Sequence, residues 1–288
     1  MEKRIMDLLR AYFSSQLVTA GFPDDLEIRW SLSHCQGDGM AFYGKLYPDD
    51  LCRLFNNIYP NTKRKQKMFS LLAKRIMEWE DMSHFTIYRN SFGYHYSHFN
   101  TMEIDLPKSD GLYFFTEPEA RQDWYFPQTK VNTYQVLWDE FVSDLERYIR
   151  DTSRQLESAG YSILESTPYE KQTVYQFSTA QFSVELITAP VDFSYFFNYE
   201  DGEDVQQLCQ SLIDKRSQCA EVYAVVRDRC TNIALGESDW INLIFDTDDN
   251  HYSGYKSELI SEAIQHAKQN IHRYSQTFSR IRPLTLVA

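Results

Sequence analysis

The chain has 288 residues and a mass of 34.1 kDa, which is long enough to bury one large hydrophobic core or two modest ones. Hydrophobic residues make up 43% and charged residues 24%, with only 10 Gly and 9 Pro, so the composition excludes a disordered, collagen-like or low-complexity chain. The net charge of −12 arises entirely after residue 110, since residues 1–110 carry 14 basic and 14 acidic side chains and residues 111–288 carry 15 and 27. Such a charge disfavours direct binding to nucleic acid and favours a basic partner or solubility alone.

Hydrophobic periodicity predicts helices and strand hairpins in alternation along the chain. A first helix over residues 5–17 is closed by Gly21 and Pro23, and the alternating residues 26–33 begin a hairpin that resumes at 40–46. Further helices are predicted at 48–58, 68–79, 133–158, 205–213 and 259–271, and further strands at 85–89, 102–106, 174–177, 182–187, 222–226 and 241–245. Hairpins separated by helices favour an α+β fold with largely antiparallel sheets flanked by helices, because a doubly wound parallel sheet needs a crossover helix between its strands.

The sequence also predicts the roles of single residues in two of the helices, and the segment between these helices suggests a domain boundary. Over residues 68–79 the apolar stripe places Trp79 on the inner face, and Gly160 is expected to end the long helix that starts at 133. Residues 107–132 contain three prolines and a glycine without a sustained period. We therefore expect two α+β parts with a soft boundary between them. The N-terminal part, over 1–110, contains the hairpin, and the C-terminal part, over 111–288, is acidic. The alternative is a single domain.

Cysteine usage and hydropathy indicate a cytoplasmic protein. The five cysteines include no CxxC pair, so neither a disulfide framework nor a zinc ribbon is indicated. No stretch approaches the roughly 20 apolar residues that span a bilayer, and the start, MEKRIMDLLRAYF, is amphipathic and lacks a secretory cleavage site. We expect no membrane segment.

The segment Gln36-Gly37-Asp38-Gly39 is the most distinctive local feature of the sequence. Two glycines around one aspartate supply positive-φ positions and a carboxylate near exposed backbone donors. That combination suits a tight turn, which is our preferred interpretation, and equally a ligand held close to the chain.

A pair of histidines three residues apart, His95 and His98, is the main candidate for catalytic chemistry. On a strand this spacing points them to opposite faces, so both ligate one metal only if the segment turns there. If the segment that holds the two histidines lies next to the glycine-rich turn, a metal or acid–base site around an activated water would be formed by His34, Asp38, His95 and His98. Histidines satisfied by neighbouring tyrosines or backbone carbonyls are the preferred alternative. The signatures GxGxxG, GxxxxGK[ST], GxSxG and HExxH do not occur in the sequence.

Two acidic segments in the second part are candidate contacts for a partner. Neither has the ligand spacing of an EF-hand loop, and solvated acidic surface is the preferred interpretation of both. The first segment holds Glu200, Asp201, Glu203 and Asp204, and the second holds Asp246, Asp248 and Asp249.

Residues 32–44, LSHCQGDGMAFYG, resemble the QGDG-A-F-x-G signature of uncharacterised proteins carried by phages and plasmids, some of which are labelled antitoxins of toxin–antitoxin stability systems. Residues 96–102 and 145–161 are similar, in the same order, to that group's histidine-containing strand and to its helix. The resemblance covers about residues 26–178. It implies no established chemistry, but it implies a mobile-element setting, in which accessory proteins bind and neutralise a toxin, a nuclease or a host defence complex.

The sequence therefore predicts an accessory protein of a mobile genetic element that binds and inhibits a macromolecular partner stoichiometrically, as an antitoxin or a counter-defence inhibitor of the anti-CRISPR kind. We expect no cofactor and no metal in this case, and the candidate contacts are Gln36, Asp38 and the two acidic segments. An exposed aromatic patch is expected of such a binder. The alternative is a metal-dependent hydrolase that acts on nucleic acid or nucleotides through Asp38, His95 and His98.

Overall fold

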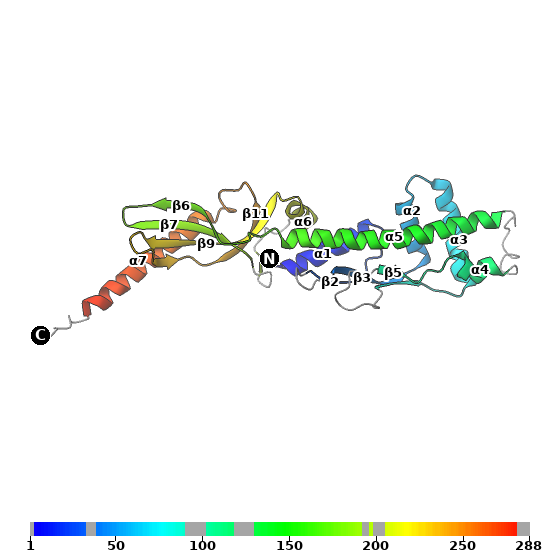
Figure 1. Ribbon diagram of the computed structural model, residues 1–288, viewed down its shortest axis with the longest axis horizontal. Coiled ribbons are helices and arrows are strands. Elements are labelled where there is room, and N and C mark those ends of the chain that lie inside the picture. The colour runs from blue at the N-terminus through cyan, green and yellow to red at the C-terminus, as the bar shows by residue number, and fades with distance from the viewer. Residues whose placement is uncertain are drawn as a thin grey trace. The chain divides into compact units, whose positions relative to one another are not determined.

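The computed structural model describes residues 3–32, 39–89, 102–117, 130–191, 196–197 and 205–280 (Figure 1). In this part of the chain, seven α-helices accompany two antiparallel sheets of four and five strands, which confirms the predicted α+β class. The predicted order of helices and hairpins also holds. The elements that the prediction lacks are short ones, such as α4 (Tyr113–Thr116) and β10 (Ala234–Glu237).

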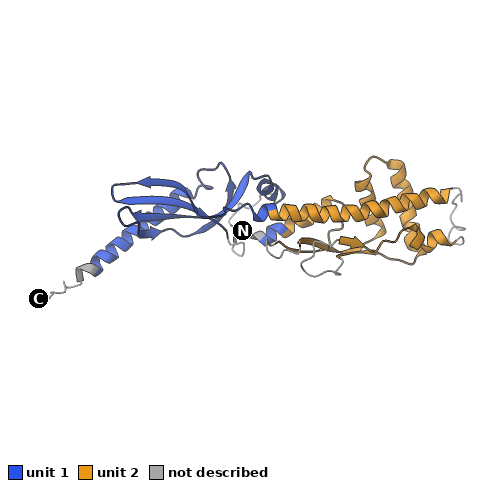
Figure 2. Ribbon diagram, in the orientation of Figure 1, with its two compact units in different colours: residues 1–9, 162–288 blue, residues 10–161 orange. Residues whose placement is uncertain are grey.

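The chain forms two compact units, one of residues 10–161 and one of residues 162–288 together with 1–9 (Figure 2). The boundary that composition suggests near residue 110 lies inside the first unit. The residues around it are fastened to the long helix α5 (Val131–Leu164), because Trp138 donates its indole N–H to the carbonyl oxygen of Pro107 at 2.9 Å. Ser109 adds two hydrogen bonds, from its backbone N–H and its hydroxyl, to the carboxylate of Asp139, each at 2.7 Å.

The unit of residues 10–161 is built on a four-stranded antiparallel sheet with the strand order β2-β3-β4-β5. Its remaining elements are helices, and α5 is the longest of them. Helix α1 begins a few residues before the unit, and α5 ends a few residues after it. In chain order the elements are α1 (Ile5–Thr19), β2 (Glu27–Ser31), β3 (Gly39–Leu46), α2 (Pro48–Ile58), α3 (Lys63–Trp79), β4 (Phe85–Arg89), β5 (Met102–Ile104), the 3-10 turn η1 (Ser109–Gly111), α4 and α5.

The hairpin predicted around the glycine-rich turn is present as β2 and β3. They pair antiparallel, with Ser31 opposite Gly39, and Gly39 has a φ of +76°, as the sequence predicts for a glycine of this turn. A Cβ atom at Gly39 would lie 2.9 Å from the Glu157 carboxylate, and Ser153 donates its hydroxyl to the Met40 carbonyl oxygen at 2.6 Å. Ser153 of α5 therefore holds the start of β3, and the Glu157 carboxylate leaves no room for a side chain at Gly39.

Gly160 does not end α5, which continues to Leu164, so this prediction is wrong. A Cβ atom at Gly160 would lie 2.5 Å from Cδ1 of Leu32 and 3.0 Å from Cζ of Phe13. The glycine is present because Leu32 and Phe13 approach the helix backbone closely, and a glycine of this kind looks like a C-cap in the sequence.

Closely packed aromatic rings from α2, α3 and α5 form part of the core of this unit. The rings of Phe55 and Phe69 lie 4.2 Å apart and those of Phe69 and Phe141 4.3 Å apart, all fully buried. Trp79, predicted on the inner face of α3, is instead 43% exposed. It is the last residue of α3, whose buried face runs from Phe69 to Met77.

The second unit is built on a five-stranded antiparallel sheet with the order β10-β9-β7-β6, in which β11 also pairs with β9. The short strands β1 and β8 pair antiparallel with each other. In chain order the elements are β1 (Lys3–Arg4), β6 (Gln172–Ser178), β7 (Phe182–Ala189), β8 (Phe196–Phe197), α6 (Val205–Ile213), β9 (Ser217–Asp228), β10, β11 (Ile241–Asp246) and α7 (Lys256–Arg280).

Side chains that alternate along β7 and β9 give this sheet two different faces. One face carries small and branched apolar residues and is covered by α7, whose C-terminal part extends beyond the strands (Figure 1). The core on this side consists of Val184, Leu186, Ala220, Val222, Ala224, Val226, Leu243, Phe245, Tyr252, Leu259, Ala263 and Ala267. No helix in the described part of the chain is both long and apolar enough to cross a membrane.

Candidate interaction face of the five-stranded sheet

The face of the sheet opposite α7 carries a second, smaller apolar cluster, formed by Ile187, Ala189, Tyr223 and Val225. Helix α6 packs against β9 near the Cys219 end of the strand, where Cys209 and Cys219 are buried and burial raises the pKa of both thiols to about 12. Away from α6, this face is hollowed into a pocket of about 350 Å³. We call this region the open face and define it by six residues that line the pocket: Lys171, Glu185, Tyr223, Arg227, Glu237 and Trp240.

A stacked aromatic pair is the central feature of the open face. The rings of Tyr223 and Trp240 lie 4.8 Å apart with an angle of 18° between their planes. The ammonium nitrogen of Lys171 lies 5.2 Å from the centre of the Trp240 ring and 5.4 Å from that of Tyr223, within the range of cation–π attraction. Tyr223 is buried, whereas Trp240 is 52% exposed, so one side of a large anchored ring remains open to solvent.

The turn between β10 and β11 holds Trp240 in this position. Buried Ser238 pairs with Ala224 of β9: its backbone N–H donates to the Ala224 carbonyl oxygen, and its hydroxyl oxygen accepts the Ala224 N–H, both at 2.9 Å. The Ser238 hydroxyl in turn donates to the carbonyl oxygen of Asp239 at 2.9 Å. These bonds fix the backbone just before Trp240 and place its ring on the neighbouring residue of β9, Tyr223.

A half-buried ion pair lies beside the aromatic pair. Arg227 Nε and Glu185 Oε2 are 3.3 Å apart, with side chains 28% and 16% exposed. Glu185 lies opposite Val225 in the β7–β9 register, so Arg227 is its diagonal neighbour on the same face. Gln176 of β6 donates to the second carboxylate oxygen at 3.4 Å. Because these groups are partly desolvated and already oriented, they add directional hydrogen-bonding capacity to an apolar surface.

A further carboxylate on this side of β9, Glu221, is affected by its surroundings. Burial raises the pKa of Glu221 above its usual range, and the positive charge of Lys171 offsets part of that effect. The open face thus combines an exposed tryptophan, a lysine at its ring and the carboxylates of Glu185 and Glu237 within one small region. Glu221 lies next to it, on the same side of β9. Tryptophan, tyrosine and arginine are the residue types that most often carry the binding energy of protein interfaces.

Most of the site residues predicted from the sequence lie outside the described residues. This holds for the turn and histidine candidates and for the first acidic segment, namely His34, Gln36, Asp38, His95, His98, Glu200, Asp201, Glu203 and Asp204. The structure therefore does not test whether the histidines and the turn converge. Among the residues that it does describe, no group of three His, Cys, Asp or Glu side chains is placed to hold a metal ion.

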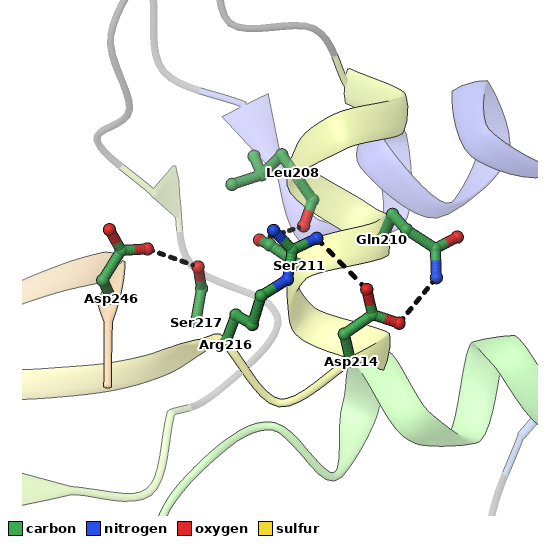
Figure 3. Close-up of polar contacts among 7 residues, drawn as sticks. All are labelled: Leu208, Gln210, Ser211, Asp214, Arg216, Ser217 and Asp246. Atoms are coloured by element: carbon green, nitrogen blue, oxygen red, sulfur yellow. Dashed lines mark hydrogen bonds and ion pairs between the residues drawn. The ribbon is translucent and has the colours of Figure 1, made fainter. Parts of the chain in front are cut away.

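The second acidic segment is described, and its first residue belongs to a polar cluster between α6, β9 and β11 (Figure 3). Ser217 donates its hydroxyl to Asp246 at 2.8 Å. Next to it, Arg216 and Asp214 form an ion pair at 3.1 Å, and Gln210 donates to the same aspartate at 2.8 Å (Figure 3). Asp246 thus contributes to the junction between β9 and β11.

Asp249 holds the loop that leads into α7. Its carboxylate accepts the backbone N–H groups of Ser253 at 2.6 Å and His251 at 2.7 Å, and these bonds lower its pKa, that from Ser253 having the largest effect. Asp248, by contrast, is exposed and makes no hydrogen bond or ion pair with the described residues. The three acids of this segment therefore differ in role, although they look equivalent in the sequence.

None of the residues of the open face is a candidate in the sequence-based prediction. The strand at 222–226 reads as a buried apolar run, and this hides the alternate positions of the longer strand, where Glu221, Tyr223 and Arg227 share one face. The full alternation over 217–228 is the signal that identifies this face. Trp240 and Lys171 each lie just before a strand and carry no pattern that marks them.

Comparison with known proteins adds no relative: no family model, curated protein or solved structure matches this chain. The resemblance of residues 26–178 to the QGDG proteins of phages and plasmids therefore stays a prediction.

Proposed function

We propose that the chain is a binding protein that holds a protein partner in a stoichiometric complex through the open face of its five-stranded sheet. The observation that carries the proposal is the half-exposed Trp240, which is stacked on Tyr223 and accompanied by Lys171. An aromatic side chain that is already held in place loses little conformational entropy when a partner covers it. Trp240, together with Tyr223, is therefore our candidate for the exposed aromatic patch that is expected of a binder.

The charges of this region favour a protein over a nucleic acid as the partner. The open face carries both signs, with Lys171 and Arg227 against Glu185 and Glu237, and the net charge of the chain is −12. A nucleic-acid site needs a dominant positive potential to neutralise phosphates. The resemblance of residues 32–44 to phage- and plasmid-borne proteins supports a toxin, a nuclease or a host defence complex as the class of partner.

Affinity purification from the natural host, followed by mass spectrometry, tests this proposal. We expect a protein to co-elute with the tagged wild-type chain at near-equal molar amount, and the Trp240→Ala variant to bind it about 30-fold more weakly, as for a hot-spot residue worth about 2 kcal/mol. Tyr274→Ala is the matched control, because Tyr274 lies on α7 in the same unit and is 55% exposed.

Two results would contradict the proposal. One is a partner that Trp240→Ala retains as well as the wild type does. The other is equal loss in both variants, which would assign the binding to a different surface. A melting temperature of Trp240→Ala close to that of the wild type shows that lost binding does not come from unfolding.

A further inference from the structure

A second pocket lies in the unit of residues 10–161, at the C-terminal end of α3. Its volume of about 580 Å³ is in the range of pockets that hold a small ligand or a few side chains. The pocket is lined by the start of α2, by the last turns of α3 and by the residues that follow α3. None of these residues belongs to the open face.

The apolar part of this pocket is made of residues that adapt to a ligand. Met77 is buried, whereas Met82 is 39% and Tyr47 46% exposed, and all three line the pocket. Methionine side chains are flexible and polarizable, which suits a surface that takes side chains of varied shape. The ring of His84 lies 6.0 Å from that of Tyr47 and extends the aromatic surface beside the pocket.

The charged part of the lining carries an excess of acid. Lys74 pairs with Asp49 at 3.2 Å, and Glu78 pairs with Arg75 at 2.9 Å. Asp81 also lines the pocket, and it makes no ion pair with any residue that the structure describes. The last turn of α3 contains no basic side chain, so no cation of that turn offsets the partial negative charge of the helix C-terminus.

We infer that this pocket binds a cationic segment of a protein, in which a lysine or arginine stands next to an apolar side chain. The excess of acid and the helix C-terminus would attract the cation, while Met77, Met82 and Tyr47 would cover the apolar neighbour. A chain with two such binding regions, one in each unit, would engage a partner through more than one segment. The inference goes beyond the proposed function, because it rests on residues of the other unit.

The probe is a synthetic peptide, Ac-Lys-Leu-Arg-Leu-Lys-NH2, titrated into full-length protein labelled with carbon-13 at the methionine methyl groups. The chain has only 7 methionines, so each methyl signal can be followed by NMR. We expect saturable shifts of the Met77 and Met82 signals, which weaken as salt is added because the attraction of exposed charges is screened. A peptide with glutamate in place of each basic residue should leave these signals unchanged.

Paired substitutions separate a specific site from the general attraction of an acidic protein for a cationic peptide. Asp81→Asn should weaken binding at least about threefold, whereas Asp248→Asn, which removes the same charge from an exposed position in the other unit, should have almost no effect. Asparagine suits the site because Asp81 has a φ of +50°, a left-handed conformation that asparagine tolerates. Met82→Ala, followed through the Met77 signal, should also weaken binding, and Met6→Ala, at a residue 45% exposed, should not.

Three results would overturn the inference. They are the absence of shifts at millimolar peptide, shifts that centre on other methionines such as Met40 and Met102, and equal weakening by Asp81→Asn and Asp248→Asn. Loss of the Trp240-dependent complex would leave this inference standing, and failure of the peptide titration would leave that complex standing, so the two proposals are tested separately.

Discussion

Asp249 shows at the scale of one residue how a carboxylate in an acidic run acquires a structural role. It accepts backbone N–H groups from His251 and Ser253, in a loop where Tyr252 and Ser253 both have a φ of +52° and Gly254 one of +87°. Residues in this left-handed region persist only where neighbouring groups hold them. The ring of Tyr252, 5.0 Å from that of Phe245, then closes the end of the core beneath α7.

We predict that Asp249→Asn destabilises the protein at neutral pH and that the effect disappears in acid. The pKa of Asp249 is lowered in the folded state, so its contribution is present above the ordinary aspartate value of 3.8 and is lost as the pH falls through the lower folded-state pKa. Because this carboxylate is largely solvated, we expect a decrease in melting temperature of only roughly 2–4 °C near pH 7, measured by circular dichroism.

Asp248→Asn is the control for this substitution, since Asp248 is exposed and without a described partner. Equal changes in both variants would show that the loss of negative charge, rather than the loop geometry, determines the result. The comparison also bears on the three acids as contact residues for a partner. Asp248 is the one whose replacement tests binding without disturbing the loop.

At the scale of elements, the packing of α7 on β10 depends on the absence of a side chain at Gly236. A Cβ atom there would overlap the backbone nitrogen of Ala267 and lie 2.7 Å from the carbonyl oxygen of Ala263. Asn270 of the same helix donates to the carbonyl oxygen of Leu235 at 2.9 Å, and Nδ1 of His266 lies at hydrogen-bond distance, 2.6 Å, from the carbonyl oxygen of Glu237, so strand and helix are joined on both sides of this contact.

Gly236→Ala should therefore destabilise the unit of residues 162–288 by about 1–3 kcal/mol, the usual cost of overpacking, because a helix backbone cannot move aside as a flexible side chain can. Chemical denaturation followed by circular dichroism measures the change. Ala234→Ser, at an exposed position of the same strand, should stay within about 0.5 kcal/mol of the wild type. A Gly236→Ala variant as stable as the wild type would mean that α7 shifts without cost.

At the scale of the molecule, periodicity in the sequence is enough to predict the fold class and nearly all the longer elements. Strand β4 and helix α6 match their predicted bounds, because each has a regular apolar pattern with clear ends. The errors arise where a residue's role depends on a distant partner. Gly160 accommodates Leu32 and Phe13, and residues 107–109 are fastened to α5, and neither relation leaves a local pattern.

The residues of the open face are not predicted from the sequence, for the same physical reason. Trp240 and Tyr223 are 17 positions apart in the chain, and only the pairing of Ser238 with Ala224 brings their rings together. Lys171 joins them from the start of another strand. A site whose residues lie on or next to three strands cannot be recognised from residue spacing until the strand register is known.

The two units also have separate cores, so we predict that they unfold locally as independent cooperative regions. The core beneath α7 draws its residues from positions 184–267, whereas the packed rings of Phe55, Phe69, Trp138 and Phe141 belong to residues 10–161. Phe69→Ala should lower the free energy of unfolding by about 3–5 kcal/mol and Val222→Ala by rather less, because each leaves a cavity in one core alone.

Hydrogen exchange read by mass spectrometry measures where each substitution acts. The exchange rate should rise in α2, α3 and α5 for Phe69→Ala, and in β9, β11 and α7 for Val222→Ala. Faster exchange throughout both units in either variant would show instead that the chain unfolds as one cooperative body.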